Sequence, residues 1–351
     1  MRFHLTEEQG AIQSAIAGTL AAAFPMARLH AFADGDADFD PESWHALMAL
    51  GLGGLLVAED AGGVGLGLVD AALACETVGA AAAPGPIAAQ MLTALAASRS
   101  DNAAAKAHLA GLISGETVAA LAFGGDGRPA DWTGSAHDGE VRFVPSARAA
   151  NVFLLGTEGG GLSLVEAGAG VTVTPVKSTD RTRRLSSVAF SGAAARTLFA
   201  PGDPFVGDLY DAALVLIAAD ALGGAQHCVD ISVAYAKERE QFGRPIGSFQ
   251  GLKHQLAHMA LDVEPARALV WYAAYAHDAD LPDARRAAAV AKAHLADRYV
   301  AVTRAAVAAH GGIGYTWDYG LNYWFRRAVF DRAFLGSPAF HRARAADLAG
   351  W

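Results

Sequence analysis

The sequence predicts a protein that is mainly α-helical, with a β-domain in the middle of the chain. Apolar residues recur at helical spacing in the first and last thirds of the 351 residues, and short alternating runs replace them in between. Hydrophobic residues make up 53% of the chain and charged residues 18%, which is typical of a globular protein. We therefore expect three domains: an N-terminal helical domain over residues 1–116, a middle β-domain over 117–205 and a C-terminal helix bundle over 206–351.

The N-terminal domain is expected to begin with a helix that Thr6 caps. The stretch LTEEQGAIQSAIAGTLAAAF places two carboxylates in the first helical turn, where they suit the helix dipole. PESWHALMALGLGGLL predicts a second helix, which ends at glycine, and LGLVDAALACETVGAA predicts a third. Closely spaced glycines precede the third helix, but no strand–helix–strand unit surrounds them. A dinucleotide-binding loop is therefore not predicted there.

The middle and last domains follow from period and spacing. The runs TVAALAFG, EVRFVP, NVFLLGT, VTVTPV and RLSSVAF read as strands separated by Gly and Asp turns. Because no helices lie between them, they predict antiparallel strands in a small barrel or sandwich. Long helical segments then predict an antiparallel four-helix bundle, at 208–240, 248–277, 282–310 and 317–335.

Composition excludes several classes of protein. There are 36 acidic and 27 basic residues, which argues against a general binder of nucleic acid or of a membrane surface. Apolar runs are broken before they reach the length of a membrane span. Cys75 and Cys228 lie far apart and lack metal-ligand spacing, so neither a disulfide nor a metal site is predicted. The start lacks the layout of a signal peptide, and we expect a cytoplasmic protein.

Residues 235–250, YAKEREQFGRPIGSFQ, form the first unusual stretch. Arg239 and Phe242 are three residues apart at a predicted helix end, and Gly243 and Pro245 stop that helix. Gln250 falls in the first turn of the next helix, after Ser248 as the predicted N-cap. An arginine beside exposed helix N–H groups suits a phosphate or pyrophosphate. The alternative is a helix–turn–helix corner in which Arg239 binds carbonyls and Phe242 belongs to the core.

Residues 308–328, AAHGGIGYTWDYGLNYWFRRA, form the second unusual stretch. Gly311 and Gly312 lie between two long helices and would bring backbone N–H groups close to a ligand. They match no Walker or dinucleotide-binding pattern, so a tight turn between helices is the alternative. A structural role for His310 is more common than a catalytic one.

These two stretches resemble the C-terminal signatures of the acyl-CoA dehydrogenase family. LTEEQ and LLVAEDAGGVGLGLVDAALACETVG resemble its N-terminal domain, and GVTVTPVKSTDRTRRLSSVAFSG resembles the end of its β-domain. The resemblance covers nearly the whole chain in the family's order. It implies FAD as cofactor and an acyl-CoA substrate, from which a carboxylate takes the α-proton while the flavin accepts the β-hydride.

The resemblance also implies roles for the two stretches. Family subunits form dimers or tetramers in which each flavin lies across an interface, and these signatures hold its ADP half. Carried over, Arg239 would bind the pyrophosphate, Phe242 would pack at the cofactor and Gln250 would hydrogen-bond it. Gly311 and Gly312 would offer backbone N–H groups. The flavin ring would lie mainly in the neighbouring subunit.

The sequence departs from the family at the catalytic base. Leu335 occupies the usual position of the glutamate, and leucine cannot accept a proton. Some members place a glutamate and an arginine near the start of the first bundle helix, where this chain has Ala213 and Leu214. Asp211 lies nearby, but two residues along a helix rotate it by about 200°. The catalytic base is therefore unknown.

The flavin-ring motifs of the β-domain are also absent. Asp126, Trp132 and Ser146 are loose remnants of them, and we expect Trp132 to pack within the β-domain. The family's Gln two residues before the HGG histidine is Ala308 here, which weakens the predicted grip on the pyrophosphate.

The pattern of losses suggests a division of labour between subunits. One branch of the family forms α2β2 heterotetramers used on bulky substrates such as steroid side-chain CoA thioesters. This chain resembles the non-catalytic subunit of such a pair, which would give the ADP side of a shared FAD site to a paralogous partner. One alternative is a self-sufficient homo-oligomer that uses Asp211 or Asp331 as the base. A second alternative is a scaffold subunit without flavin. The electron acceptor is not identified by the sequence.

Overall fold

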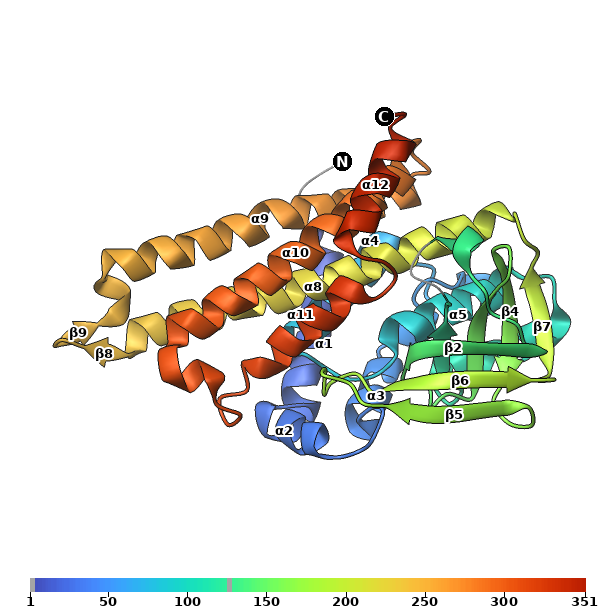
Figure 1. The fold of residues 1–351 in the computed structure, drawn as a ribbon, viewed down its shortest axis with the longest axis horizontal. Helices are drawn as coiled ribbons and strands as arrows, with labels where there is room; N and C mark the ends of the chain where they lie inside the picture. The colour runs from blue at the N-terminus through green and yellow to red at the C-terminus, as the bar shows by residue number, and fades with distance from the viewer. Residues whose placement is uncertain (1–3, 125–127) are drawn as a thin grey trace.

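The computed structural model describes residues 4–124 and 128–351 (Figure 1). Helices come first along the chain, then two β-sheets, then long helices. The predicted fold class, mainly α with a β middle part, is confirmed. The last N-terminal helix ends at Ser114 and the first strand begins at Ala119, while the last strand of the two sheets ends at Phe199. The domain limits 1–116, 117–205 and 206–351 remain our division of the chain.

Seven α-helices lie in the described residues of the N-terminal part. They are α1 (Glu7–Ala23), α2 (Met26–Asp34), α3 (Pro41–Ala49), α4 (Leu68–Ala80), α5 (Ile87–Arg99), α6 (Ala103–Lys106) and α7 (Leu109–Ser114). Thr6 caps α1 as predicted, because its hydroxyl accepts from the N–H of Gln9 and the Gln9 side chain accepts from the N–H of Thr6. Among the described residues, no single helix is long and apolar enough to cross a membrane, although the bent pair α1 and α2 passes by length and composition.

The middle of the chain is a two-sheet sandwich. Its strands are β1 (Ala119–Ala122), β2 (Asp138–Pro145), β3 (Val152–Thr157), β4 (Gly161–Glu166), β5 (Val171–Val176), β6 (Leu185–Ser191) and β7 (Ala195–Phe199). One sheet has the order β1-β3-β4-β7 and the other the order β2-β6-β5. Phe153 and Phe190, one from each sheet, pack edge to face with centroids 6.0 Å apart, so the core lies between the sheets.

The prediction of antiparallel strands is wrong for one pair. β1 and β3 run parallel, while the other pairs of the two sheets are antiparallel. The chain leaves β1, forms β2 in the opposite sheet and returns to β3 in the same direction. This excursion supplies the crossover that parallel neighbours need. Strands β4 and β7 were not predicted, because the short run GLSLVE and the exposed ARTLF carry a weak alternation signal.

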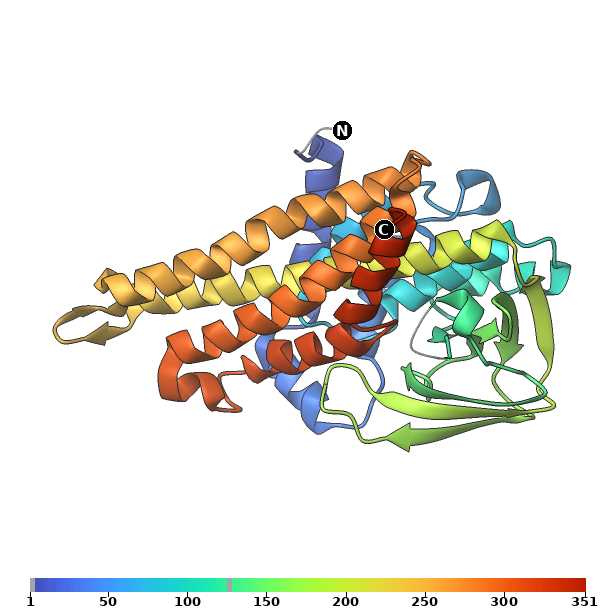
Figure 2. The same cartoon turned by 45° about the horizontal axis from the view of Figure 1, so that its top comes forward.

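The C-terminal part contains five helices. They are α8 (Pro204–Glu238), α9 (Gln250–Asp278), α10 (Ala284–His310), α11 (Asn322–Ala333) and α12 (Pro338–Leu348). The long α8, α9 and α10 lie side by side in both views (Figures 1 and 2). The predicted helix 317–335 is shorter, and α12 follows it as a further helix. Leu335 and Gly336 adopt positive φ angles of 58° and 106°, which end the first helix, and Ser337 caps the second.

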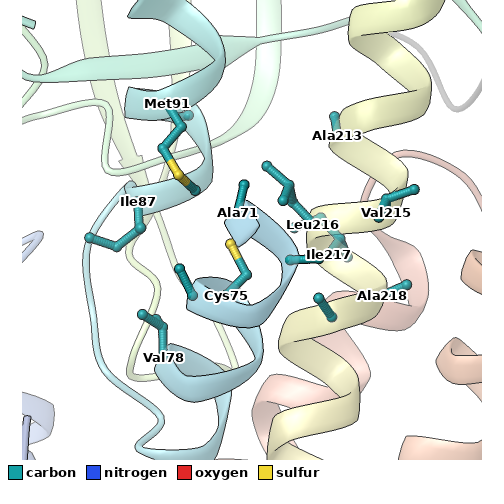
Figure 3. Close-up of a cluster of buried hydrophobic side chains, with 14 of the residues drawn as sticks. Ala71, Cys75, Val78, Ile87, Met91, Ala213, Val215, Leu216, Ile217 and Ala218 are labelled. Atoms are coloured by element: carbon teal, nitrogen blue, oxygen red, sulfur yellow. The ribbon is translucent and has the colours of Figure 1, made fainter. Parts of the chain in front are cut away.

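Helix α8 passes close to the N-terminal helix α4. A Cβ added at Gly223 would overlap the carbonyl oxygen of Glu76, and one at Gly79 would overlap that of Asp220. Cys75 and Val78 of α4 belong to the buried cluster that α4 forms with α5 and α8 (Figure 3). Helix α4 therefore packs closely against the middle of α8, and Ala213 lies nearer the start of the same helix.

Candidate functional site

The residues of the first signature lie at one tip of the long helices. Helix α8 ends at Glu238, and Arg239 is its C-cap. The short strands β8 (Glu240–Gln241) and β9 (Arg244–Pro245) then form a hairpin, which projects from this end of the molecule (Figure 1). Its two turn residues, Phe242 and Gly243, have φ angles of 55° and 76°. Two positive φ angles in succession are typical of a tight hairpin turn, in which glycine or asparagine is usual and phenylalanine is rare.

The Phe242 side chain is held outside the protein core. It is 92% exposed, although its ring lies 6.0 Å from that of Phe249. The interpretation of Phe242 as a core residue is therefore wrong for this chain. A large aromatic side chain that is both exposed and held in a rare backbone conformation marks a candidate binding surface.

The second signature forms the turn after α10. A 3₁₀ helix spans Gly311–Tyr315, and Gly311 has φ 65° and ψ −140°, a conformation that favours glycine. A Cβ added at Gly311 or Gly312 would meet no described heavy atom within 4 Å, so the space above the turn is open. The Gly311 N–H already donates to the carbonyl of Ala308.

His310 joins the two signatures. Its ring stacks on that of Tyr235 of α8, with centroids 4.6 Å apart, and packs 4.9 Å from the ring of Tyr319. The Nδ1 atom lies 2.7 Å from the carbonyl oxygen of Ala306, and burial lowers the pKa of the imidazole. His310 therefore has a packing role. Because Tyr235 precedes Arg239 by one helical turn, this stack holds Arg239 and Gly311 at the same end of the molecule.

This tip carries cationic and aromatic groups that face solvent. Arg239 is exposed, and its side chain has no hydrogen bond or ion pair within residues 4–124 and 128–351. Arg244 lies over the ring of Phe249, with its Cζ 4.2 Å from the centroid. Gln250, the first residue of α9, is also exposed, and Ser248 lies in the 3₁₀ turn before it rather than at the predicted N-cap. Exposed cations, an aromatic face and an open glycine turn fit the phosphates and adenine of a dinucleotide.

A second region, beside the first half of α8, holds both positions that the sequence resemblance assigns to the catalytic base. Leu335 and Ala213 line the same inner cavity, whose volume is about 60 Å³. An outer cavity of about 400 Å³ adjoins it on the side of the β-domain, and Leu335 lines this one too. The structure therefore brings together two positions that are 122 residues apart, and neither carries a group that accepts a proton.

A network of paired charges forms the floor of the inner cavity. Asp220 accepts hydrogen bonds from Arg183 at 2.9 Å and from Arg327 at 2.5 and 2.8 Å, and Arg183 also binds Asp331 at 2.7 Å. Burial raises the pKa of Asp220, but the two guanidinium groups outweigh burial and hold it below its usual value. This network was not predicted from the sequence, although the doubled arginines in RTRRLSS and WFRRA were a signal for it.

The two carboxylates considered as relocated bases do not reach either cavity. Asp211 is buried against Arg344 of α12, with Oδ1 2.6 Å from Nη1. Asp331 is buried beside Arg183, and burial raises the pKa of its carboxyl to about 7. Neither lines the inner or the outer cavity. The idea that Asp211 or Asp331 replaces the glutamate therefore finds no geometric support.

The remnants of the flavin-ring motifs serve packing. Trp132 is buried and stacks on Phe123 at 4.4 Å, in agreement with the packing role predicted for it. Ser146 is buried, and its hydroxyl donates to the carbonyl of Asp38 at 3.4 Å. Asp126 lies outside the described residues.

Comparisons with known proteins identify the family. Residues 6–116 match the profile described as "Acyl-CoA dehydrogenase, N-terminal domain", and residues 213–349 match "Acyl-CoA dehydrogenase, C-terminal domain". The chain belongs to the acyl-CoA dehydrogenase family. This family is one of FAD-dependent oxidoreductases.

Two relatives and one solved structure are similar over most of this chain. Acyl-CoA dehydrogenase IpdE2 of Mycolicibacterium smegmatis is 31% identical over 95% of this chain and 96% of its own length. Acyl-CoA dehydrogenase FadE34 of Mycobacterium tuberculosis is 34% identical over 93% of this chain, but the match covers 45% of FadE34. A variant of the Tcur3481-Tcur3483 steroid ACAD superimposes with a TM-score of 0.88 at 29% identity, over 98% of both chains.

Proposed function

We propose that this chain is a subunit of an FAD-dependent acyl-CoA dehydrogenase that acts on the α,β-bond of an acyl-CoA thioester. In this proposal it lacks the catalytic base and gives the ADP side of an FAD site to a paralogous partner, in an α2β2 assembly. One observation carries the proposal. Leu335 and Ala213 line one cavity, and neither is a carboxylate, whereas the ADP-side residues remain exposed at the tip.

The tip residues would act on the phosphate end of the cofactor. FAD, when bound, supplies the hydride acceptor for the reaction. Arg239 would bind a phosphate through its guanidinium, which is free of other partners among the described residues. Because the Gly311 N–H is already bonded to Ala308, Gly312 is the better candidate for a backbone donor. Phe242 would cover an apolar face of the cofactor, and Gln250 would hydrogen-bond it.

The inner cavity is poorly suited to an acyl group. Pockets that bind ligands of moderate size have volumes of about 300–1,000 Å³. The inner cavity holds about 60 Å³, and its floor is made of Asp220, Arg183 and Arg327, whose charges are paired with one another. The productive acyl site is therefore assigned to the partner subunit.

The relatives support a two-subunit arrangement. The solved steroid ACAD pairs Tcur3481 with Tcur3483, and we extend such pairing, with a role in lipid or steroid catabolism, to this chain. Both cysteines are buried and free, in keeping with a reducing compartment such as the cytoplasm.

The flavin spectrum of the purified protein tests the proposal. The chain is purified alone and again after co-expression with the paralogue encoded beside it, and bound flavin is counted per chain. We expect a colourless chain alone and a yellow complex with about half a flavin per subunit. A bright yellow chain that oxidises acyl-CoA without a partner would contradict the proposal. A colourless complex would favour the scaffold alternative.

One observation favours a second candidate, the self-sufficient homo-oligomer. The outer cavity of about 400 Å³ has apolar walls that include Phe123, Phe330 and Phe334, and a flat ring has room there. No described carboxylate that is free of an arginine lines this cavity, since Asp180 lies 3.7 Å from Arg183. One flavin per chain in the protein purified alone would select this candidate.

A further inference from the structure

Four apolar side chains form a wall between the inner and the outer cavity. Leu121, Phe330, Phe334 and Leu335 line both cavities, and we call them the partition. The rings of Phe330 and Phe334 stack with centroids 4.9 Å apart. The partition separates a space of about 400 Å³ from one of about 60 Å³. An acyl group that entered the outer cavity would therefore stop at this wall.

Leu335 is fixed in the partition by its backbone. Its φ of 58° lies in the left-handed region, which leucine rarely adopts. The carbonyl of Leu335 accepts hydrogen bonds from the Tyr210 hydroxyl at 3.0 Å and from Nε2 of His341 at 2.8 Å. The buried ammonium of Lys292 donates to the next carbonyl, that of Gly336, at 3.2 Å. Hydrogen-bond donors from α8, α10 and α12 thus stabilise this loop in a backbone conformation that leucine rarely adopts.

The backbone of Leu335 and the buried ammonium of Lys292 both cost folding free energy, and the packing of the loop does not explain why they are kept. Lys292 is 1% exposed, and burial lowers the pKa of its ammonium to about 8. A buried ammonium and a strained leucine persist only where surrounding contacts enforce them, and they cluster at functional sites. Here they place one side chain between two cavities. Leu335 is 8% exposed and points its bulk into that wall.

We propose that Leu335 closes this chain's own acyl cavity, so that a subunit without a base does not bind an acyl-CoA unproductively. The ligand class that it excludes is the acyl portion of a CoA thioester. This inference rests on the proposed function, because it assigns the productive site to the partner. Leu335 is then a specificity-determining residue in place of the missing base.

Counting acyl-CoA sites in the co-expressed complex tests this inference. Leu335→Gly removes the side chain from the partition, and glycine adopts a φ of 58° without strain. The parent complex and the variant are titrated with butyryl-CoA by isothermal titration calorimetry. We expect one site per pair of unlike subunits in the parent and two in the variant. Free CoA should give no additional site, because the gain depends on the acyl group.

The matched control is Leu348→Ala, which shortens a half-exposed leucine of α12 far from the partition and should leave one site. Two sites in the parent, or one site in a folded Leu335→Gly complex, would overturn the inference. If Leu335→Gly does not fold, Leu335→Ala is tested in its place, because alanine keeps the Cβ and removes only the rest of the side chain from the partition. Flavin is counted in the same samples. Half a flavin per chain with an unchanged site count defeats only the inference, whereas one flavin per chain in the parent defeats the proposed function.

Discussion

The two ends of α8 differ in what surrounds them. At the tip, Arg239 and Phe242 face solvent on a projecting hairpin. Around the first half of the same helix, Ala213 and Asp220 are buried against α4, α5 and α11, and every charge on the cavity floor has a partner within the chain. At the tip the side chain of Arg239 has no partner among the described residues, whereas the charges around the inner cavity are paired with one another.

Under the proposed function, this difference explains how a subunit without the catalytic base keeps its fold. Buried positions such as Leu335 and Ala213 can exchange a carboxylate for an apolar group without leaving a charge unpaired, because burial favours the apolar side chain. At the exposed tip, an apolar side chain gains no stability from burial. An exposed phenylalanine at positive φ contributes little to stability, so its presence is better explained by what it binds.

The largest expected effect comes from breaking the cavity floor. Arg327→Met leaves Asp220 with one guanidinium partner in a buried site, and we expect the free energy of unfolding to fall by about 3–5 kcal/mol. Urea denaturation measures it. The control is Arg326→Met, whose guanidinium makes an exposed hydrogen bond to the carbonyl of Thr179 and should change stability by less than about 1 kcal/mol. Equal losses in both variants would show that the floor is not a structural network.

The network also marks the limit of prediction from the sequence. Period and composition predicted the order of helices and sheets, because those signals are local. The roles of the tip residues stay predictions. Arg183 and Asp331 are 148 residues apart and meet only after the β-domain packs on α11. The parallel pairing of β1 and β3 has the same cause, since it depends on which sheet β2 joins.

The site around Leu335 was predictable in part. The resemblance assigned Leu335 to the place of the glutamate from its position after WFRRA, but nothing in the sequence indicated the cavity wall. The wall joins Leu121 of β1 to Phe330 and Phe334 of α11 and its C-cap, and no spacing in the sequence indicates that contact. Helix α12 was missed because its stretch PAFHRARAADL has few large apolar residues, so a helical period was hard to see.

The second largest effect is expected at Arg239, at the tip of α8. In the co-expressed complex, Arg239→Ala should weaken flavin retention by about 1.5–3 kcal/mol, the range for a hydrogen bond to a charged group. Equilibrium dialysis of flavin from the complex measures the loss, which should shrink at high salt. Arg286→Ala, near the start of α10 and so at its opposite end, is the matched control and should retain flavin as the parent does. Unchanged retention in Arg239→Ala would show that Arg239 does not contact the cofactor.

Lowering the pH should decrease the free energy of unfolding through His341, which lies beside the inner cavity. This imidazole is buried against the Leu335 carbonyl, and burial lowers its pKa to about 4, below the value of about 6.5 in an unfolded chain. The unfolded state therefore binds more protons between these values, so the contribution is complete above pH 6.5 and is lost as pH falls towards 4. Between pH 7 and pH 5 the loss should reach about 2 kcal/mol.

Urea denaturation at pH 7 and pH 5 measures this term in the parent and in His341→Gln. The variant should lose less stability on acidification than the parent, by about the amount given above. His45→Gln replaces an exposed histidine of α3 and should follow the parent at both pH values. A parallel response of the parent and His341→Gln would mean that the imidazole of His341 has the same pKa in the folded and the unfolded chain.

The smallest effect on stability is expected at two phenylalanines, and flavin retention distinguishes the two regions in which they lie. Phe242 at the tip and Phe143 at the outer cavity are both exposed phenylalanines with positive φ, of 55° and 60°. Asparagine tolerates this conformation better, so Phe242→Asn and Phe143→Asn should each raise the free energy of unfolding by up to about 1 kcal/mol. Flavin retention by the complex should fall for Phe242→Asn alone, since only that residue lies at the proposed ADP site. If both substitutions weakened retention equally, the outer cavity would also take part in flavin binding, and the contrast between the two ends of α8 would no longer hold.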